Sequence, residues 1–110
     1  MYKLEFLPSA QQDMLEIVRY ISFELKNPNA ADLLAIDFFN AAESVLTFPY
    51  ANRVYQTTQP LNHEYRKIIV KNYLMFYWVD ENKQLVTIAR VVYAKRDYIQ
   101  SLKKFNKIVS

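Results

Sequence analysis

Three extended runs of aromatic and β-branched residues in the second half of the chain restrict its fold more than any other feature. They cover residues 65–71, 73–79 and 84–93, separated by the short turns Lys71-Asn72 and Asp80-Glu81-Asn82-Lys83. Runs of this composition with links this short predict β-strands joined as two successive antiparallel hairpins. The central run is apolar at every position, which indicates a strand covered on both faces.

The first half of the chain carries helical periodicity instead. After a short strand expected over residues 2–7, Ser9 and Gln12 have the spacing of a capping box, which predicts the start of a helix. Asn27 and Pro28 suit the N-cap and first position of a second helix. Apolar residues at spacings of three and four mark the inward faces: Met14, Val18, Ile21 and Leu25 in the first helix, and Ala31, Leu34, Phe38, Phe39, Ala42, Val45 and Leu46 in the second. The acidic residues between them are expected on the solvent-facing side: Asp13, Glu16, Asp37 and Glu43.

The order of these elements predicts the fold class. Residues 97–108 have the pattern of a short basic C-terminal helix, so the expected order is β-α-α-β-β-β-α. Helices gathered ahead of a strand meander predict an α+β fold, in which a helical hairpin packs on a twisted, mostly antiparallel four-stranded sheet that includes the N-terminal strand. A chain of 110 residues suffices for one core, so residues 1–110 are expected to form a single domain.

The composition excludes several kinds of chemistry. The chain contains no cysteine and no glycine. It therefore lacks a disulfide framework, a thiol nucleophile, a P-loop and a glycine-rich dinucleotide turn. With one histidine and no cysteine, neither a metal nor another cofactor is expected. The longest apolar run is far below the roughly 20 residues that cross a bilayer, and no signal peptide is evident, so a cytoplasmic protein without membrane association is expected.

Charge is distributed unevenly along the chain. Residues 1–52 carry three Lys or Arg against seven Asp or Glu, whereas residues 53–110 carry eleven against four. Such a basic half predicts an anionic partner, either nucleic acid or an acidic protein segment. An ordinary solvated surface is the alternative interpretation.

Several segments resemble the RelE/ParE superfamily of toxins from bacterial type II toxin–antitoxin systems, over nearly the whole chain. Residues 65–80, YRKIIVKNYLMFYWVD, are similar to the superfamily's arginine-led strand, Asn-Tyr turn and aromatic strand. Residues 88–98, IARVVYAKRDY, are similar to its last strand and the Arg-Asp-Tyr entry into the final helix. The remaining matches fall in the helical hairpin: Ser9-Ala10, Asp13, Ile17, Tyr20-Ile21 and Ala30-Ala31.

The resemblance implies a growth-arresting toxin and a protein partner. The partner is a cognate antitoxin whose C-terminal segment wraps the toxin. Our first expectation for the activity is an mRNA interferase, an endoribonuclease that binds RNA and cuts mRNA on the ribosome. The alternative is a ParE-like poison of DNA gyrase that performs no chemistry, and a third possibility is a degenerate member that only binds nucleic acid.

The nuclease interpretation assigns roles to particular residues. Arg66 and Arg90 match positions where nuclease members place arginines, and a guanidinium binds phosphate bidentately. Tyr93 lies where YoeB-like members carry a terminal tyrosine, which would stack on a base or assist proton transfer. Alternatively, the arginines anchor the sheet or pair with Glu64 or Asp97, and Tyr93 contributes only to packing.

The same interpretation lacks an obvious general acid. YoeB-like members place a histidine just before the terminal tyrosine, and this chain has Val92 there. Lys67, Lys95 or Arg96 could compensate, and His63, three residues before Arg66, could reach the same region. These four are also the expected substrate-binding residues. Strand alternation, however, is expected to put Lys67 on the face opposite Arg66, and a lone loop histidine is more often simply solvated.

Overall fold

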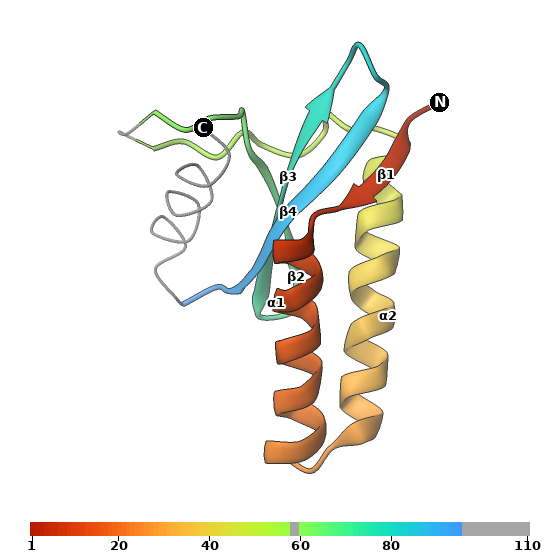
Figure 1. The fold of residues 1–110 in the computed structure, drawn as a ribbon, viewed down its shortest axis with the longest axis vertical. Coiled ribbons are helices and arrows are strands. Elements are labelled where there is room, and N and C mark those ends of the chain that lie inside the picture. Colours follow the sequence, from red (N-terminus) through yellow and green to blue (C-terminus); the bar gives the residue numbers. More distant parts are fainter. Residues whose placement is uncertain (58–59, 96–110) are drawn as a thin grey trace.

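The computed structural model describes residues 1–57 and 60–95. Within these ranges it contains one sheet and a helical hairpin (Figure 1). The elements are β1 (Lys3–Phe6), α1 (Pro8–Arg19), the π-helix η1 (Tyr20–Glu24), α2 (Pro28–Val45), β2 (Arg66–Val70), β3 (Tyr73–Asp80) and β4 (Leu85–Tyr93). The predicted α+β class is confirmed, while the helix expected over residues 97–108 lies outside the described residues.

The strands form one mixed sheet in the order β1-β4-β3-β2. β2, β3 and β4 make the predicted antiparallel meander, and β1 pairs in parallel with β4. The register of β3 and β4 shifts between Phe76 and Tyr77, so that β4 accommodates an extra residue there. Because the chain has no glycine, left-handed backbone falls on Lys26, Lys71 and Gln84, each of which lies in or beside a turn.

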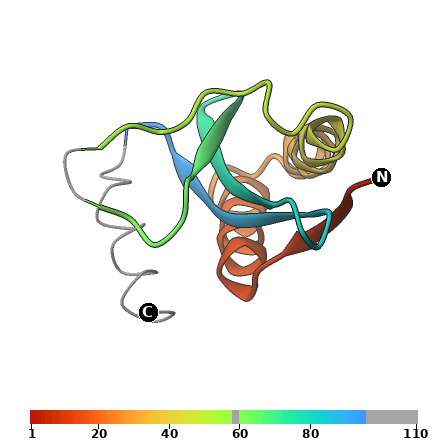
Figure 2. The same ribbon diagram turned by 90° about the horizontal axis from the view of Figure 1, so that it is seen from above.

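Apolar side chains cover both faces of this sheet. The larger cluster joins Phe38 and Ala42 of α2 and Ala10 of α1 to Met75 and Tyr77 of β3. A smaller cluster on the other face contains Tyr65, Leu74, Phe76, Ala89 and Val92. Figure 2 shows both helices nearly end on, with β3 and β4 crossing beside them. Burial on both faces explains why β3 is apolar throughout.

The start of α1 differs from the sequence prediction. The N-cap is Leu7, with Pro8 in the first turn, so the capping box expected at Ser9 and Gln12 is wrong. Proline suits this first position, which places Ser9 one residue inside the helix. The Ser9 hydroxyl instead donates to the carbonyl oxygen of Ala89 at 2.7 Å, and the Gln12 amide donates to Glu16.

The start of α2 agrees with its prediction. Asn27 is the N-cap and its side-chain oxygen accepts a hydrogen bond from the Ala30 N–H at 3.1 Å. Most of the expected inward residues of α2 are buried, but Leu46 is only partly buried and Phe39 is 52% exposed. In the first helix Leu25 is 56% exposed, because the helical repeat changes at η1 before that residue is reached. No helix within the described ranges is long and apolar enough to span a membrane.

Candidate functional site

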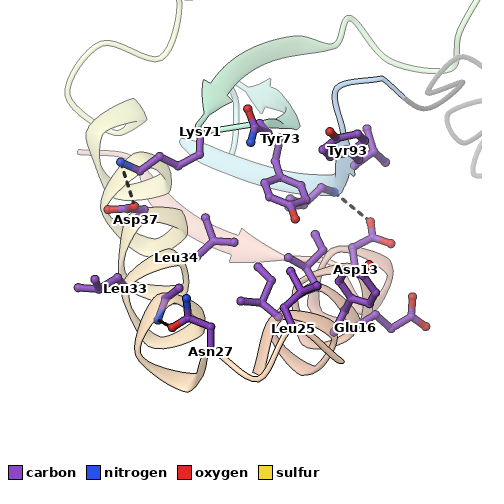
Figure 3. Close-up of a pocket in the computed structure, with 17 residues that line it drawn as sticks. Asp13, Glu16, Leu25, Asn27, Leu33, Leu34, Asp37, Lys71, Tyr73 and Tyr93 are labelled. Atoms are coloured by element: carbon purple, nitrogen blue, oxygen red, sulfur yellow. Dashed lines mark hydrogen bonds and ion pairs between the residues drawn. The ribbon is translucent and has the colours of Figure 1, made fainter. Parts of the chain in front are cut away.

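A groove lies between the far half of the helical hairpin and the end of the sheet where β3 starts and β4 ends (Figure 3). Its cavity volume is about 1110 Å³. The aliphatic part of the lining comes mostly from the helical hairpin, with two residues from β4: Ile17, Ile21, Leu25, Leu33, Leu34, Val91 and Val92. Three tyrosines and several charged side chains complete it: Tyr20, Tyr73, Tyr93, Asp13, Glu16, Asp37 and Lys71. An apolar groove with a few polar groups at its rim is suited to binding a protein segment.

The π-helix η1 shapes the mouth of this groove. The Leu25 N–H donates to the Tyr20 carbonyl oxygen at 3.1 Å, five residues back, instead of the four residues of an α-helix. The wider turn changes which residues face the sheet, and it leaves Tyr20 and Leu25 more than half exposed. π-helical turns are rare and often lie at functional sites.

An aromatic row lies along the sheet side of the groove. Tyr73 makes edge-to-face contacts with Phe38 at 5.7 Å and with Tyr93 at 5.7 Å. Burial raises the pKa of Tyr73, and the neighbouring Tyr93 and Tyr20 phenols raise it further. Its phenol therefore stays neutral. Tyr93, a predicted catalytic residue, is 40% exposed here, so it can reach a bound partner.

Arg90 is held by α1. Its Nε and Nη2 atoms donate to the two carboxylate oxygens of Asp13 at 2.7 and 3.0 Å. Asp13 also accepts the Val91 N–H at 2.9 Å. The two side chains are only 18% and 13% exposed, so the expectation that Asp13 faces solvent is wrong. The carboxylate reaches the sheet because β1 ends at Phe6 and leaves this part of the β4 edge for α1 to cover.

Arg66 is also engaged within the protein. Its Nη1 donates to the carbonyl oxygens of Tyr50 and Asn52 at 3.2 and 2.7 Å, and its Nη2 pairs with Glu64 at 3.2 Å. The guanidinium also lies over the Tyr50 ring, 5.1 Å from its centre. The pairing with Glu64 is the one that the sequence left open as an alternative. β3 separates the strands that carry Arg66 and Arg90, and the two side chains bind different parts of the chain.

The remaining predicted residues are dispersed. His63 stacks on Trp78 with ring centres 3.7 Å apart, and burial lowers its pKa. Lys67 lies over the Tyr55 ring, beside Phe76, whereas Arg66 lies beside Tyr77. This difference fits the expectation that Lys67 and Arg66 lie on opposite faces of the sheet. Lys95 is exposed after β4, and Arg96 lies outside the described residues. In the described part of the chain, no three His, Cys, Asp or Glu side chains are placed to hold a metal ion.

Several solved structures of toxin–antitoxin proteins share this fold. A chain of the chromosomal ParDE toxin–antitoxin system from P. aeruginosa has a TM-score of 0.70 at 14% identity, with 86% of this chain and 98% of that chain covered. The RelBE2 toxin–antitoxin complex of Mycobacterium tuberculosis gives 0.57 at 16% identity over 84% and 96%. A mutant of the E. coli toxin RelE in the free state gives 0.58 at 19% identity over 92% of each chain. These structures share the RelE/ParE fold with this chain.

The family is identified by the sequence itself. The family model described as the ParE toxin of the type II toxin–antitoxin system parDE matches residues 4–98. The chain therefore belongs to the ParE toxin family and is the toxin of a type II toxin–antitoxin system, which confirms the resemblance to the RelE/ParE superfamily. A comparison with curated proteins gave no match.

Proposed function

We propose that this toxin arrests growth as a non-enzymatic poison of DNA gyrase, the second of the two activities that the sequence suggests. The observation that carries the proposal is the engagement of Arg66 and Arg90 within the protein. Membership of the ParE family supports it. The proposal gives both arginines a structural function, in which each ties the sheet to a neighbouring segment.

The geometry around Arg90 argues against phosphate binding. A bidentate carboxylate uses the same fork of N–H donors that a phosphate would use. Releasing Asp13 would leave its carboxylate, which is 13% exposed, without the arginine. Leaving one member of such a pair unpaired costs several kcal/mol. The guanidinium of Arg66 is similarly enclosed, with its side chain 14% exposed.

The histidine that YoeB-like nucleases place beside the terminal tyrosine is also missing here. Val92, where YoeB-like members have histidine, is 2% exposed and packs in the smaller cluster. His63 is engaged in its stack with Trp78. Tyr93 is the observation that favours the nuclease, because it is 40% exposed at the groove. Phosphoryl transfer needs a proton donor and fixed positive charge beside such a tyrosine, and both predicted arginines are bound elsewhere in the protein.

Primer extension on mRNA in a reconstituted translation reaction tests this choice. We expect the purified, folded toxin to produce no new cuts on translated message. Cuts that require translation would overturn the proposal and restore mRNA cleavage as the activity. In that case, loss of the cuts in Tyr93→Phe would assign a catalytic function to the phenol, since this variant keeps the ring packing.

We further propose that the groove receives a segment of the antitoxin. The lining is aliphatic in its centre, and Glu16 lies at its rim together with Asp37, which pairs with Lys71. A segment with apolar residues on one face and Lys or Arg beside them fits this pattern. The partner chemistry here is therefore opposite in charge to what the basic second half of the sequence suggested.

A matched pair of substitutions tests the groove. Leu33→Asp places a charge in the groove, and Ile69→Asp does the same on β2, outside it; the two side chains are 64% and 72% exposed. The probe is the cognate antitoxin, to be sought as the product of a short reading frame beside the toxin gene. We expect Leu33→Asp to weaken its binding by tenfold or more, roughly the loss of one interface anchor, and Ile69→Asp to have little effect. Equal effects would argue against the groove.

A further inference from the structure

Among the residues that the structure describes, no strand pairs with the outer edge of β1. β1 lies at the end of the sheet, and its neighbour β4 covers only one of its sides. The Lys3 N–H donates to Gln84 at 2.8 Å and the Leu7 N–H donates to Ile88 at 2.9 Å. In a parallel pair, every second residue bonds the neighbour, so the N–H and C=O groups of Leu4 and Phe6 point outward. Such an edge is a template for another strand.

The sequence of this edge is complementary to itself. Residues 2–6 read Tyr-Lys-Leu-Glu-Phe. If a second copy pairs antiparallel about a two-fold axis at Leu4, Lys3 lies directly opposite Glu5 of the second copy, and Glu5 lies opposite its Lys3. Tyr2 then lies opposite Phe6 of the second copy. Opposite charges and apolar pairs at directly facing positions stabilise an antiparallel ladder.

We propose that two copies of this chain associate through their β1 strands and form one continuous eight-stranded sheet. The exposure of the side chains along β1 fits this arrangement. Lys3 and Glu5 are exposed, whereas Leu4 and Phe6 are partly buried against the main core. Both charge pairs would therefore form on the open face of the joined sheet, while the apolar side chains extend the core across the dyad.

The helical side of the edge supplies further apolar surface. Phe39 of α2 packs edge-to-face on Phe6 with ring centres 5.5 Å apart, yet it is 52% exposed. A second copy at the β1 edge would cover part of this ring. The sequence predicted that Phe39 would be buried, yet it is more than half exposed in a single copy.

The other strand edges are either covered by neighbouring segments or carry like charges that oppose pairing. Beyond Ile88, the β4 edge is covered by α1, where Ser9 bonds Ala89 and Asp13 bonds Val91. The start of β2 is bridged by Val54. The remaining part of the β2 edge is flanked by Lys67 and Lys71, so a second copy there would bring like charges together. Among the described strands, only the β1 edge combines an unpaired backbone with charges of both signs.

This association leaves the groove free. The groove residues come from the hairpin and from the ends of β3 and β4, and none comes from β1. In Figure 1, β1 lies beside the C-terminal end of α2, away from the hairpin turn. The inference is independent of the gyrase proposal, since a dimer can form whatever the toxin's target is.

Sedimentation equilibrium of the purified chain over a wide concentration range tests the pairing. A single chain has a mass of 13.1 kDa, and we expect twice this mass at high concentration. The dimer fraction should fall when the ionic strength is raised, because salt screens the charge pairs. Lys3→Glu and Glu5→Lys each place like charges in both symmetric pairs. Each should weaken dimerisation by roughly ten- to a hundredfold. The double variant, which exchanges the charges, should restore it.

Two controls keep the test decisive. Glu5 accepts a hydrogen bond from Thr87 at 3.2 Å, and this bond is lost both in Glu5→Lys and in the double variant. The difference between these two variants therefore isolates the pairing between copies. Hydrogen exchange should show the Leu4 and Phe6 amides becoming protected as concentration rises. A wild-type chain that stays monomeric, or single variants that dimerise as well as wild type, would overturn the proposal.

Discussion

Asp13 joins the first helix to the last strand through several long-range polar contacts. It accepts three hydrogen bonds, two from Arg90 and one from the Val91 N–H, across 77 and 78 positions of sequence. Its role was not predictable from the sequence, because the position has the local pattern of a solvent-facing helical residue. Only a register between α1 and the β4 edge, which no local pattern encodes, brings the carboxylate to Arg90.

We expect Asp13→Ala to lower the free energy of unfolding by roughly 2–4 kcal/mol, because it leaves a largely buried guanidinium and a backbone N–H without their acceptor. The matched control is Asp37→Ala, since Asp37 pairs with Lys71 at 3.9 Å on the surface. That exposed pair is worth less than about 0.5 kcal/mol. Urea denaturation measures both, and equal losses would contradict the account of Asp13.

Tyr65 presents the opposite case, a buried hydroxyl without a partner. The residue is 1% exposed, and its phenol oxygen makes no hydrogen bond in the structure. Burial also raises its pKa. We expect Tyr65→Phe to change the free energy of unfolding by less than about 0.5 kcal/mol or to stabilise the fold, because no bond is lost.

Tyr77→Phe is the comparison for this prediction. The Tyr77 hydroxyl donates to the Pro49 carbonyl oxygen at 2.8 Å and accepts from Asn52 at 3.2 Å. Removing it should cost about 1–2 kcal/mol. Thermal unfolding of the two variants gives the answer, and a Tyr65→Phe protein that loses as much as Tyr77→Phe would show that its hydroxyl has a partner in solution.

At the level of elements, the strands and the second helix were predictable because their signals are local. The aromatic and β-branched runs correspond to β2, β3 and β4, and Asn27 with Pro28 marks the start of α2. The first helix was predicted less well. Because Pro8 starts the helix, the expected capping box does not form. The π-helix η1 interrupts the helical repeat, and the sequence offers no clear signal for it.

The cap of α2 can be tested directly. Asn27 accepts the Ala30 N–H, so Asn27→Ala should lower the free energy of unfolding by about 1 kcal/mol, whereas Asn27→Gly should lower it by only a few tenths. Chemical denaturation followed by circular dichroism measures the difference. If alanine and glycine were equivalent, the side-chain cap would contribute nothing, and Pro28 alone would start the helix.

At the scale of the whole molecule, the distribution of charge along the sequence did not predict where the charged side chains lie in the fold. Acidic residues of the first half pair with basic residues of the second half, at the largely buried Asp13 with Arg90 and at the exposed Asp37 with Lys71. Fold and superfamily followed from the order of elements and motifs. The candidate site did not, since the predicted residues are dispersed. Of the residues first assigned to the inward faces of the hairpin, only Ile21, Leu25 and Leu34 line the groove.

The most direct test of the central claim is gyrase-mediated DNA cleavage. Purified gyrase and supercoiled plasmid are incubated with the toxin and ATP, and the protein is then denatured to reveal trapped breaks. The account predicts linear DNA that depends on both toxin and gyrase. An absence of breaks with folded toxin, together with translation-dependent cuts in mRNA, would contradict it and return Arg66, Arg90 and Tyr93 to catalytic roles.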